Sequence, residues 1–74
     1  MCLAIPMQIK TITAGNAVCE AKQVQREVSL FLLQDQALGP GDHVLVHVGY
    51  AIQKITPEEA QATWELLDEV AAHA

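Results

Sequence analysis

The sequence is poor in positive charge and in aromatic residues. Its 74 residues include four Lys or Arg against nine Asp or Glu, for a formal net charge of −5, with one Phe, one Tyr and one Trp. Proteins that follow a phosphate backbone cluster Lys and Arg, and those that bind single strands add aromatic rings on which bases stack. The composition therefore argues against nucleic acid, and no nucleic-acid partner is expected.

Long apolar runs are also absent from the sequence. No stretch approaches the roughly 20 apolar residues that cross a bilayer, and no apolar segment typical of a signal peptide surrounds Lys10. We therefore expect a cytoplasmic protein with no membrane partner. Its two cysteines, Cys2 and Cys19, are expected to be free thiols, as is usual in a reducing compartment.

Common enzyme motifs are missing as well. The chain has no glycine-rich phosphate loop, no GxSxG, no HExxH and no CxxC. Two acidic pairs occur, Glu58 with Glu59 and Asp68 with Glu69, but adjacent residues of a helix face different directions. Solvated helix surface explains these pairs better than acid–base catalysis does. We expect that the protein is not an enzyme.

Apolar alternation predicts short strands over the first three quarters of the chain. The alternation slips at Ile12, which predicts a bend or bulge there, and Gly49 predicts a bulge or a close backbone approach within the final strand. Several short strands in so small a chain favour a closed barrel, which leaves no exposed edges. The strands are predicted at residues 3–13, 17–22, 24–33 (whose second half is uniformly apolar) and 43–52.

A helix is predicted after the strands. Thr56 is the expected N-cap, Pro57 the first helical residue, and Glu59 completes a capping box. Helical spacing extends to about residue 71 and gives one apolar stripe, formed by Ala60, Trp64, Leu67 and Ala71. The predicted fold is mainly β in a single domain, residues 1–74: a small OB-like antiparallel β-barrel over about 3–55 and a C-terminal α-helix over about 57–71. A small sandwich is the alternative.

Cys2 carries the most informative chemistry. A small residue after the initiator methionine usually allows that methionine to be removed, and Cys2 would then combine a thiol with a free α-amine. A neighbouring positive charge lowers the pKa of a thiol and so favours the thiolate that binds metals. The alternative is that Cys2 is a small apolar residue at a chain end.

The possible metal ligands do not match a closed zinc site. Cys2, Cys19 and three histidines lack the spacings of such sites. An open iron site fits better, because thiolate and imidazole are suitable iron ligands and the other positions can be filled from outside the chain. His47 suits this role, since alternation puts it on the opposite strand face from the valines. From the residues alone, an ordinary barrel histidine remains the alternative.

Three segments together resemble the HypC/HupF/HybG family of hydrogenase maturation proteins. They are Cys2-Leu3-Ala4-Ile5-Pro6, Val24-Gln25-Arg26-Glu27-Val28, and the block from Gly41 to Ile52 that contains His47. The helix with Glu58, Glu59 and Ala60 also falls where the family has its C-terminal helix. One difference is that Lys22-Gln23 stand where the family often has a glycine.

The resemblance implies a metallochaperone with an OB-like barrel and a C-terminal helix. The implied partners are the iron–sulfur scaffold protein HypD and the precursor of the [NiFe]-hydrogenase large subunit. The implied cargo is iron with cyanide and carbon monoxide ligands, transiently carried by Cys2 with His47. A metal-independent protein-interaction adaptor is the alternative function. Partner binding is expected around the metal ligands, at Cys2, Leu3, Ile5, Pro6 and Leu45.

Overall fold

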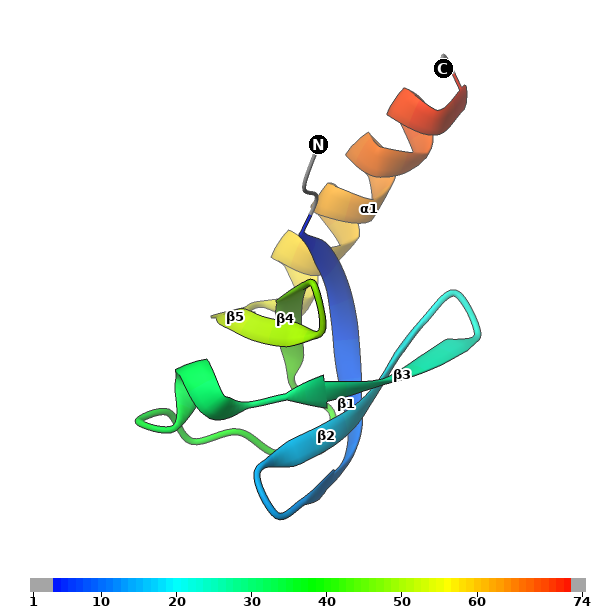
Figure 1. Ribbon diagram of the computed structural model, residues 1–74. Helices are drawn as coiled ribbons and strands as arrows, with labels where there is room; N and C mark the ends of the chain where they lie inside the picture. Colours follow the sequence, from blue (N-terminus) through cyan, green and yellow to red (C-terminus); the bar gives the residue numbers. More distant parts are fainter. Residues whose placement is uncertain (1–3, 73–74) are drawn as a thin grey trace.

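Five strands of the computed structural model, which describes residues 4–72, close into a barrel. The strands pair in the order β1-β2-β3-β5-β4, with β4 returning to β1 (Figure 1). The predicted mainly β barrel is confirmed. All pairs are antiparallel except that of β3 with β5, which closes the barrel in parallel at Ser29 and Tyr50. The strands are β1 (Ile5–Thr13), β2 (Asn16–Ala21), β3 (Val24–Ser29), β4 (His43–His47) and β5 (Tyr50–Ile55).

The barrel interior is filled by the inward-facing residues of alternate strand positions. Residues directly opposite one another in paired strands share a face, and the buried pairs Met7 with Val44 and Ile9 with Cys19 follow this rule. With few aromatics available, β-branched and small side chains fill the space. The core cluster comprises Met7, Ile9, Ala17, Cys19, Val28, Leu30, Leu33, Val44, Val46 and Ala51.

Strand β1 bends where its pairing with β2 changes register. The irregularity lies between Ile9 and Thr11, two residues before the predicted slip at Ile12. Its neighbour is the loop ahead of β4, since the Ile9 amide donates to the Asp42 carbonyl at 2.8 Å and the Gly41 amide donates to the Ile9 carbonyl at 2.8 Å. The bulge therefore lets β1 pair with both neighbours around a tightly curved barrel.

Two-residue turns join three of the antiparallel strand pairs: Ala14-Gly15, Lys22-Gln23 and Val48-Gly49. Both residues of each turn have positive φ, as a type I′ hairpin turn requires. The turn at Val48-Gly49 corrects the prediction of one continuous strand over 43–52, because Gly49 reverses the chain instead of marking a bulge. Lys22-Gln23 forms the same kind of turn without glycine.

The segment predicted as a strand over 24–33 also ends early. Strand β3 stops at Ser29, and a short 3₁₀ helix, η1 (Phe31–Leu33), follows. The Phe31 amide donates to the Ser29 hydroxyl at 3.2 Å, which favours the turn over continued pairing. The uniformly apolar run is thus not a strand buried on both faces: Leu30 and Leu33 are buried, while Phe31 and Leu32 are exposed.

Helix α1 (Pro57–Ala72) begins at the predicted capping box. The Glu59 amide donates to the Thr56 hydroxyl at 3.0 Å, and the Thr56 amide donates to the Glu59 carboxylate at 2.9 Å. The helix packs on β1 and β4 by its first half, and its second half projects beyond the strands (Figure 1). Ala60 is therefore buried and Trp64 half-buried, whereas Ala71, predicted on the packed stripe, is exposed.

Candidate functional site

The candidate site lies where β1 begins and β4 ends. Ile5 pairs with Val46, so that His47 is the next residue of β4 beside the start of β1. His47 is half-buried and pairs across the hairpin with Tyr50, so that their side chains share the outer face of the barrel. Cys2 and Leu3, both predicted at this site, lie outside the described residues. The described part of the site is therefore centred on His47.

Helix α1 fixes the start of β1 through Trp64. The indole Nε1–H donates to the Pro6 carbonyl oxygen at 2.9 Å, and the Pro6 side chain is fully buried. Proline has no N–H and a restricted φ, so this segment combines a stiff residue with a partly buried hydrogen bond. The sequence indicated Trp64 only as a core residue of the helix stripe. The available signal was that a tryptophan packed on its neighbours usually finds a hydrogen-bond partner for its indole N–H.

The predicted partner-binding residues do not all share one face. Ile5 pairs with the buried Val46, so the two side chains share the inner face of the sheet, and 37% of the Ile5 surface is exposed. Leu45 pairs with Pro6 on the outer face and is half-buried. A partner that contacts both Ile5 and Leu45 would have to reach side chains on both faces of the sheet. Their role in partner binding stays a prediction.

Cys19 does not have the environment of a metal ligand. Its side chain is completely buried between β1 and β3, and this burial raises the pKa of its thiol. A raised pKa keeps the thiol protonated near neutral pH, whereas metal binding needs the thiolate. Cys19 is therefore a core residue.

His43 occupies the same face of β4 as His47 but a different environment. It lines the hollows beneath the start of α1, together with Pro57, and its Nδ1 is buried with no hydrogen-bond partner. Within residues 4–72, no group of three or more His, Cys, Asp or Glu side chains is arranged to hold a metal ion. A metal at His47 would thus need ligands from outside this part of the chain.

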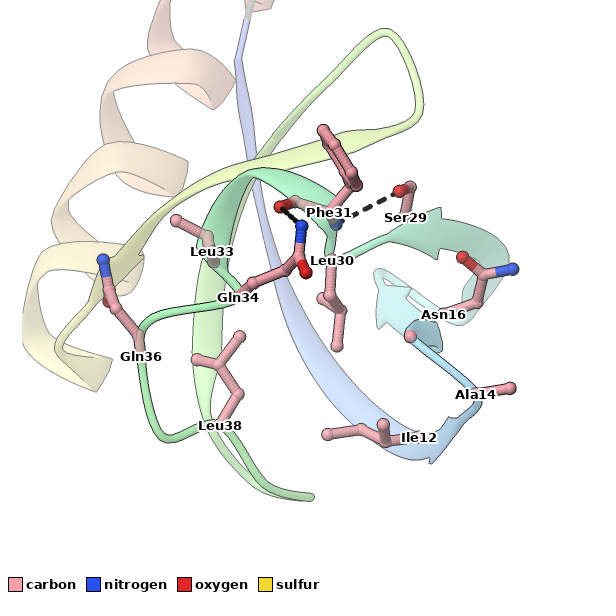
Figure 2. A pocket seen from close by; sticks show the side chains of 11 residues that line it. Ile12, Ala14, Asn16, Ser29, Leu30, Phe31, Leu33, Gln34, Gln36 and Leu38 are labelled. Atoms are coloured by element: carbon pink, nitrogen blue, oxygen red, sulfur yellow. Dashed lines mark hydrogen bonds between the residues drawn. The ribbon is translucent and has the colours of Figure 1, made fainter.

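A groove lies on a separate part of the barrel, shown in Figure 2. It has a volume of about 490 Å³ and runs between the Ala14-Gly15 turn and η1. No lining residue has an ionisable side chain, and none belongs to the start of β1 or the end of β4. The groove offers apolar and amide contacts without acid–base or ligand chemistry.

In the described range 4–72, no helix combines the length and the apolar character needed to cross a membrane.

The comparisons with known proteins agree on one family. The HupF/HypC family matches residues 1–67. Hydrogenase maturation factor HypC of Cupriavidus necator is 45% identical over 71 residues, covering 95% of this chain and 77% of that protein. The protein of the same name from Rhizobium leguminosarum bv. viciae is 46% identical over 70 residues, covering 93% and 91%. That of Escherichia coli K12 is 39% identical over 71 residues, covering 90% and 79%.

Proposed function

The chain belongs to the HupF/HypC family, and from this premise we propose that it is a hydrogenase maturation factor that carries iron to a hydrogenase precursor. The cargo is iron with cyanide and carbon monoxide ligands. Cys2 is the principal protein ligand and His47 the second. The protein acts as a carrier in the cytoplasm and catalyses no reaction itself.

The position of His47 is the observation that carries this proposal. His47 directly follows Val46 in β4, and Val46 pairs with Ile5, the first residue of β1. In the sequence, Cys2 stands three positions before Ile5. Cys2 stands two positions before Ala4 in the sequence, and covalent geometry limits the distance between their Cα atoms to about 7 Å. We propose that this short reach lets the Cys2 thiolate and His47 hold the same iron.

A site with two protein ligands suits a carrier better than a closed cage. Thiolate and imidazole both bind iron, and the cyanide and carbon monoxide ligands occupy other positions of the cargo. The remaining position can be filled by a group of the donor or of the acceptor protein. Exchange of one ligand at a time would then let the iron pass between proteins without being released to water.

The proposed partners are the scaffold protein HypD, on which the iron group is assembled, and the precursor of the hydrogenase large subunit. Both must reach the same two ligands, so both are expected to cover the start of β1 and the end of β4. The Trp64–Pro6 hydrogen bond supports partner binding at this surface, because it fixes the start of β1 relative to helix α1 before a partner arrives. A preorganised segment loses less conformational entropy on binding.

The central experiment compares the two cysteines. The chain is purified from anaerobic cells that co-express HypD, and infrared bands are recorded in the cyanide and carbonyl stretching region. We expect the bands in the original chain and in Cys19→Ala, and their loss in Cys2→Ala. Hydrogenase activity in cells without another such chaperone is expected to follow the bands.

The two histidines of β4 provide a second matched pair. His47→Asn is expected to shift or weaken the infrared bands, whereas His43→Asn, checked for folding by circular dichroism, is expected to leave their frequencies unchanged. The adaptor alternative makes the opposite prediction for cysteine, because an adaptor without metal would support full hydrogenase maturation after Cys2→Ala. That result would remove the carrier proposal.

A further inference from the structure

Strand β3 has an open edge. On one side it pairs with β2 along its whole length, from Val24 to Ser29. On the other side, within residues 4–72, it pairs with β5 at Ser29 and Tyr50, where the Ser29 amide donates to the Gly49 carbonyl at 2.9 Å. The side of β3 that faces away from β2 is therefore unpaired over residues 24–28 in this part of the chain. An unpaired strand edge is a template for pairing with another strand.

The open edge presents the backbone N–H and C=O groups of two residues. In an antiparallel pair, every second residue directs both groups to the same side. Because the Ser29 amide points away from β2, the groups of Gln25 and Glu27 point away from β2 as well. Both residues are exposed, and a cavity of about 260 Å³ separates Glu27 from the turn residue Val48. Four backbone groups are therefore accessible to an added strand.

Arg26 lies between these two residues and points to the inner face of the sheet. Its partner in β2 is the fully buried Cys19, and Val24 and Val28 share its face. The Arg26 guanidinium donates from Nη1 to the Gln25 carbonyl at 2.9 Å, so the side chain occupies one of the four edge groups. An inward-pointing charge is one of the means by which natural proteins protect a strand edge.

The arrangement of the edge groups determines how two copies of β3 can pair antiparallel about a two-fold axis. All four groups of each copy are used when Gln25 lies opposite Glu27 of the second copy. Arg26 then lies directly opposite Arg26 of the second copy, and like charges in that position destabilise a sheet. A shift in one direction would require Gln23, whose φ is 68°. A shift in the other would require Ser29, whose amide already donates within the barrel.

We propose that Arg26 prevents the open edge of β3 from pairing with a second copy of this chain. The edge is a latent dimer interface whose occupant is β3 of that copy, with residue 26 on the two-fold axis. Arg26 opposes the pairing by its charge and by holding the Gln25 carbonyl. With valine in its place, β3 would have three valines on its inner face, and valine favours strand pairing. The inference requires no iron, so it stands or falls separately from the carrier function.

The test compares Arg26→Val with Glu27→Val, its neighbour on the same edge. Both changes replace an exposed charged side chain by the same apolar one. The formal net charge of −5 becomes −6 in Arg26→Val and −4 in Glu27→Val. Because net charge of one sign opposes association, a general charge effect would favour association of the control. Association of Arg26→Val alone would therefore reflect the pairing of β3.

Molar mass is measured by light scattering under reducing conditions, at protein concentrations up to about 1 mM so that weak association is detected. Circular dichroism checks that each variant is folded. We expect the molar mass to double in Arg26→Val. We expect it to equal that of the original chain in Glu27→Val and in Arg26→Lys, which retains the positive charge. A folded Arg26→Val variant with the mass of the original chain, or an equal increase in Glu27→Val, would overturn the proposal.

A cross-linking experiment tests the register and also applies if Arg26→Val precipitates. Arg26→Cys and Gln25→Cys are each combined with Cys2→Ala and treated with oxidised glutathione, which accepts the two electrons when two thiols join. In the proposed register, residue 26 meets residue 26 of the second copy with the Cα atoms about 4.5 Å apart, a distance that a disulfide spans. We expect several-fold more disulfide-linked dimer in Arg26→Cys than in Gln25→Cys. Equal amounts would refute the pairing.

Discussion

Helix α1 is attached to the barrel at two places that differ in burial. At β1, the Trp64 indole donates to the Pro6 carbonyl at 2.9 Å in a partly buried contact, next to a fully buried proline side chain. At the turn between β2 and β3, Lys22 Nζ lies 2.6 Å from an Asp68 carboxylate oxygen and 5.0 Å from the centre of the Trp64 ring. More than half of the surface of each of the two charged side chains is exposed.

The difference teaches which strand the helix stabilises. A hydrogen bond shielded from water and accompanied by apolar packing contributes more than an exposed ion pair, whose median contribution is about 0–1 kcal/mol. The helix therefore fixes the start of β1, from which the chain leads to Cys2, and contacts the β2–β3 turn weakly. A protein of this size has a free energy of unfolding of about 4–11 kcal/mol, so the attachment at β1 is a considerable part of the total.

The largest expected effect is that of Trp64→Ala. This substitution removes the packing on Pro6 and the hydrogen bond together, and large-to-small changes of buried aromatic residues cost about 3–5 kcal/mol. Because Trp64 is only half-buried, we expect a loss of about 2–3 kcal/mol in urea unfolding. We also expect weaker binding of HypD by the folded fraction, since the start of β1 is no longer fixed.

Trp64→Phe is the control that separates packing from hydrogen bonding. It retains a ring and removes the donor, so the expected loss is about 1 kcal/mol, a decrease of roughly 4–8 °C in unfolding temperature. If Trp64→Ala were no more harmful than an exposed substitution, the attachment at β1 would not be the stronger one.

A smaller effect is expected from Thr56→Ala at the start of the helix. The substitution removes the hydroxyl that accepts from the Glu59 amide, and loss of an N-cap typically costs about 1 kcal/mol. Both contacts of α1 with the barrel depend on a helix that begins at this cap. We therefore expect the unfolding temperature to fall by a few degrees.

Thr63→Ala is the matched control for the cap. The Thr63 hydroxyl donates to the Glu59 carbonyl at 2.8 Å within the helix, an interaction that competes with regular helix bonding. Alanine also has the higher helix propensity. We therefore expect an unchanged or slightly higher unfolding temperature, and a fall equal to that of Thr56→Ala would show that the cap has no special weight.

The sequence predicted those features that depend on neighbouring residues. Thr56 and Glu59 are three positions apart, and the capping box they form has the predicted geometry. Alternation in β1 likewise predicted the inward-facing Met7 and Ile9. The hydrogen bond from Trp64 to Pro6 joins residues 58 positions apart, and no local pattern encodes it.

The turn at Val48-Gly49 was missed for a different reason. A β-branched residue is typical of strands, so Val48 extended the predicted strand through the position where the chain reverses. The apolar run ending at Leu33 was equally ambiguous, because short apolar runs occur in strands and in helical turns. At the candidate site, His47 was predicted from the resemblance to a family, and spacing alone left an ordinary histidine as the alternative.

The smallest effect is expected at the exposed attachment of the helix. A double-mutant cycle of Lys22→Gln and Asp68→Asn measures the interaction between the two side chains. Glutamine keeps the positive φ of the turn residue equally unfavourable, so the cycle isolates the charges. We expect a coupling free energy of about 0.3–0.5 kcal/mol that becomes smaller in 1 M salt, since exposed charges are screened. HypD binding should not change in either variant. A coupling above about 1 kcal/mol would make the β2–β3 turn as firmly attached as β1, and the helix would then organise both hairpins instead of the start of β1 alone.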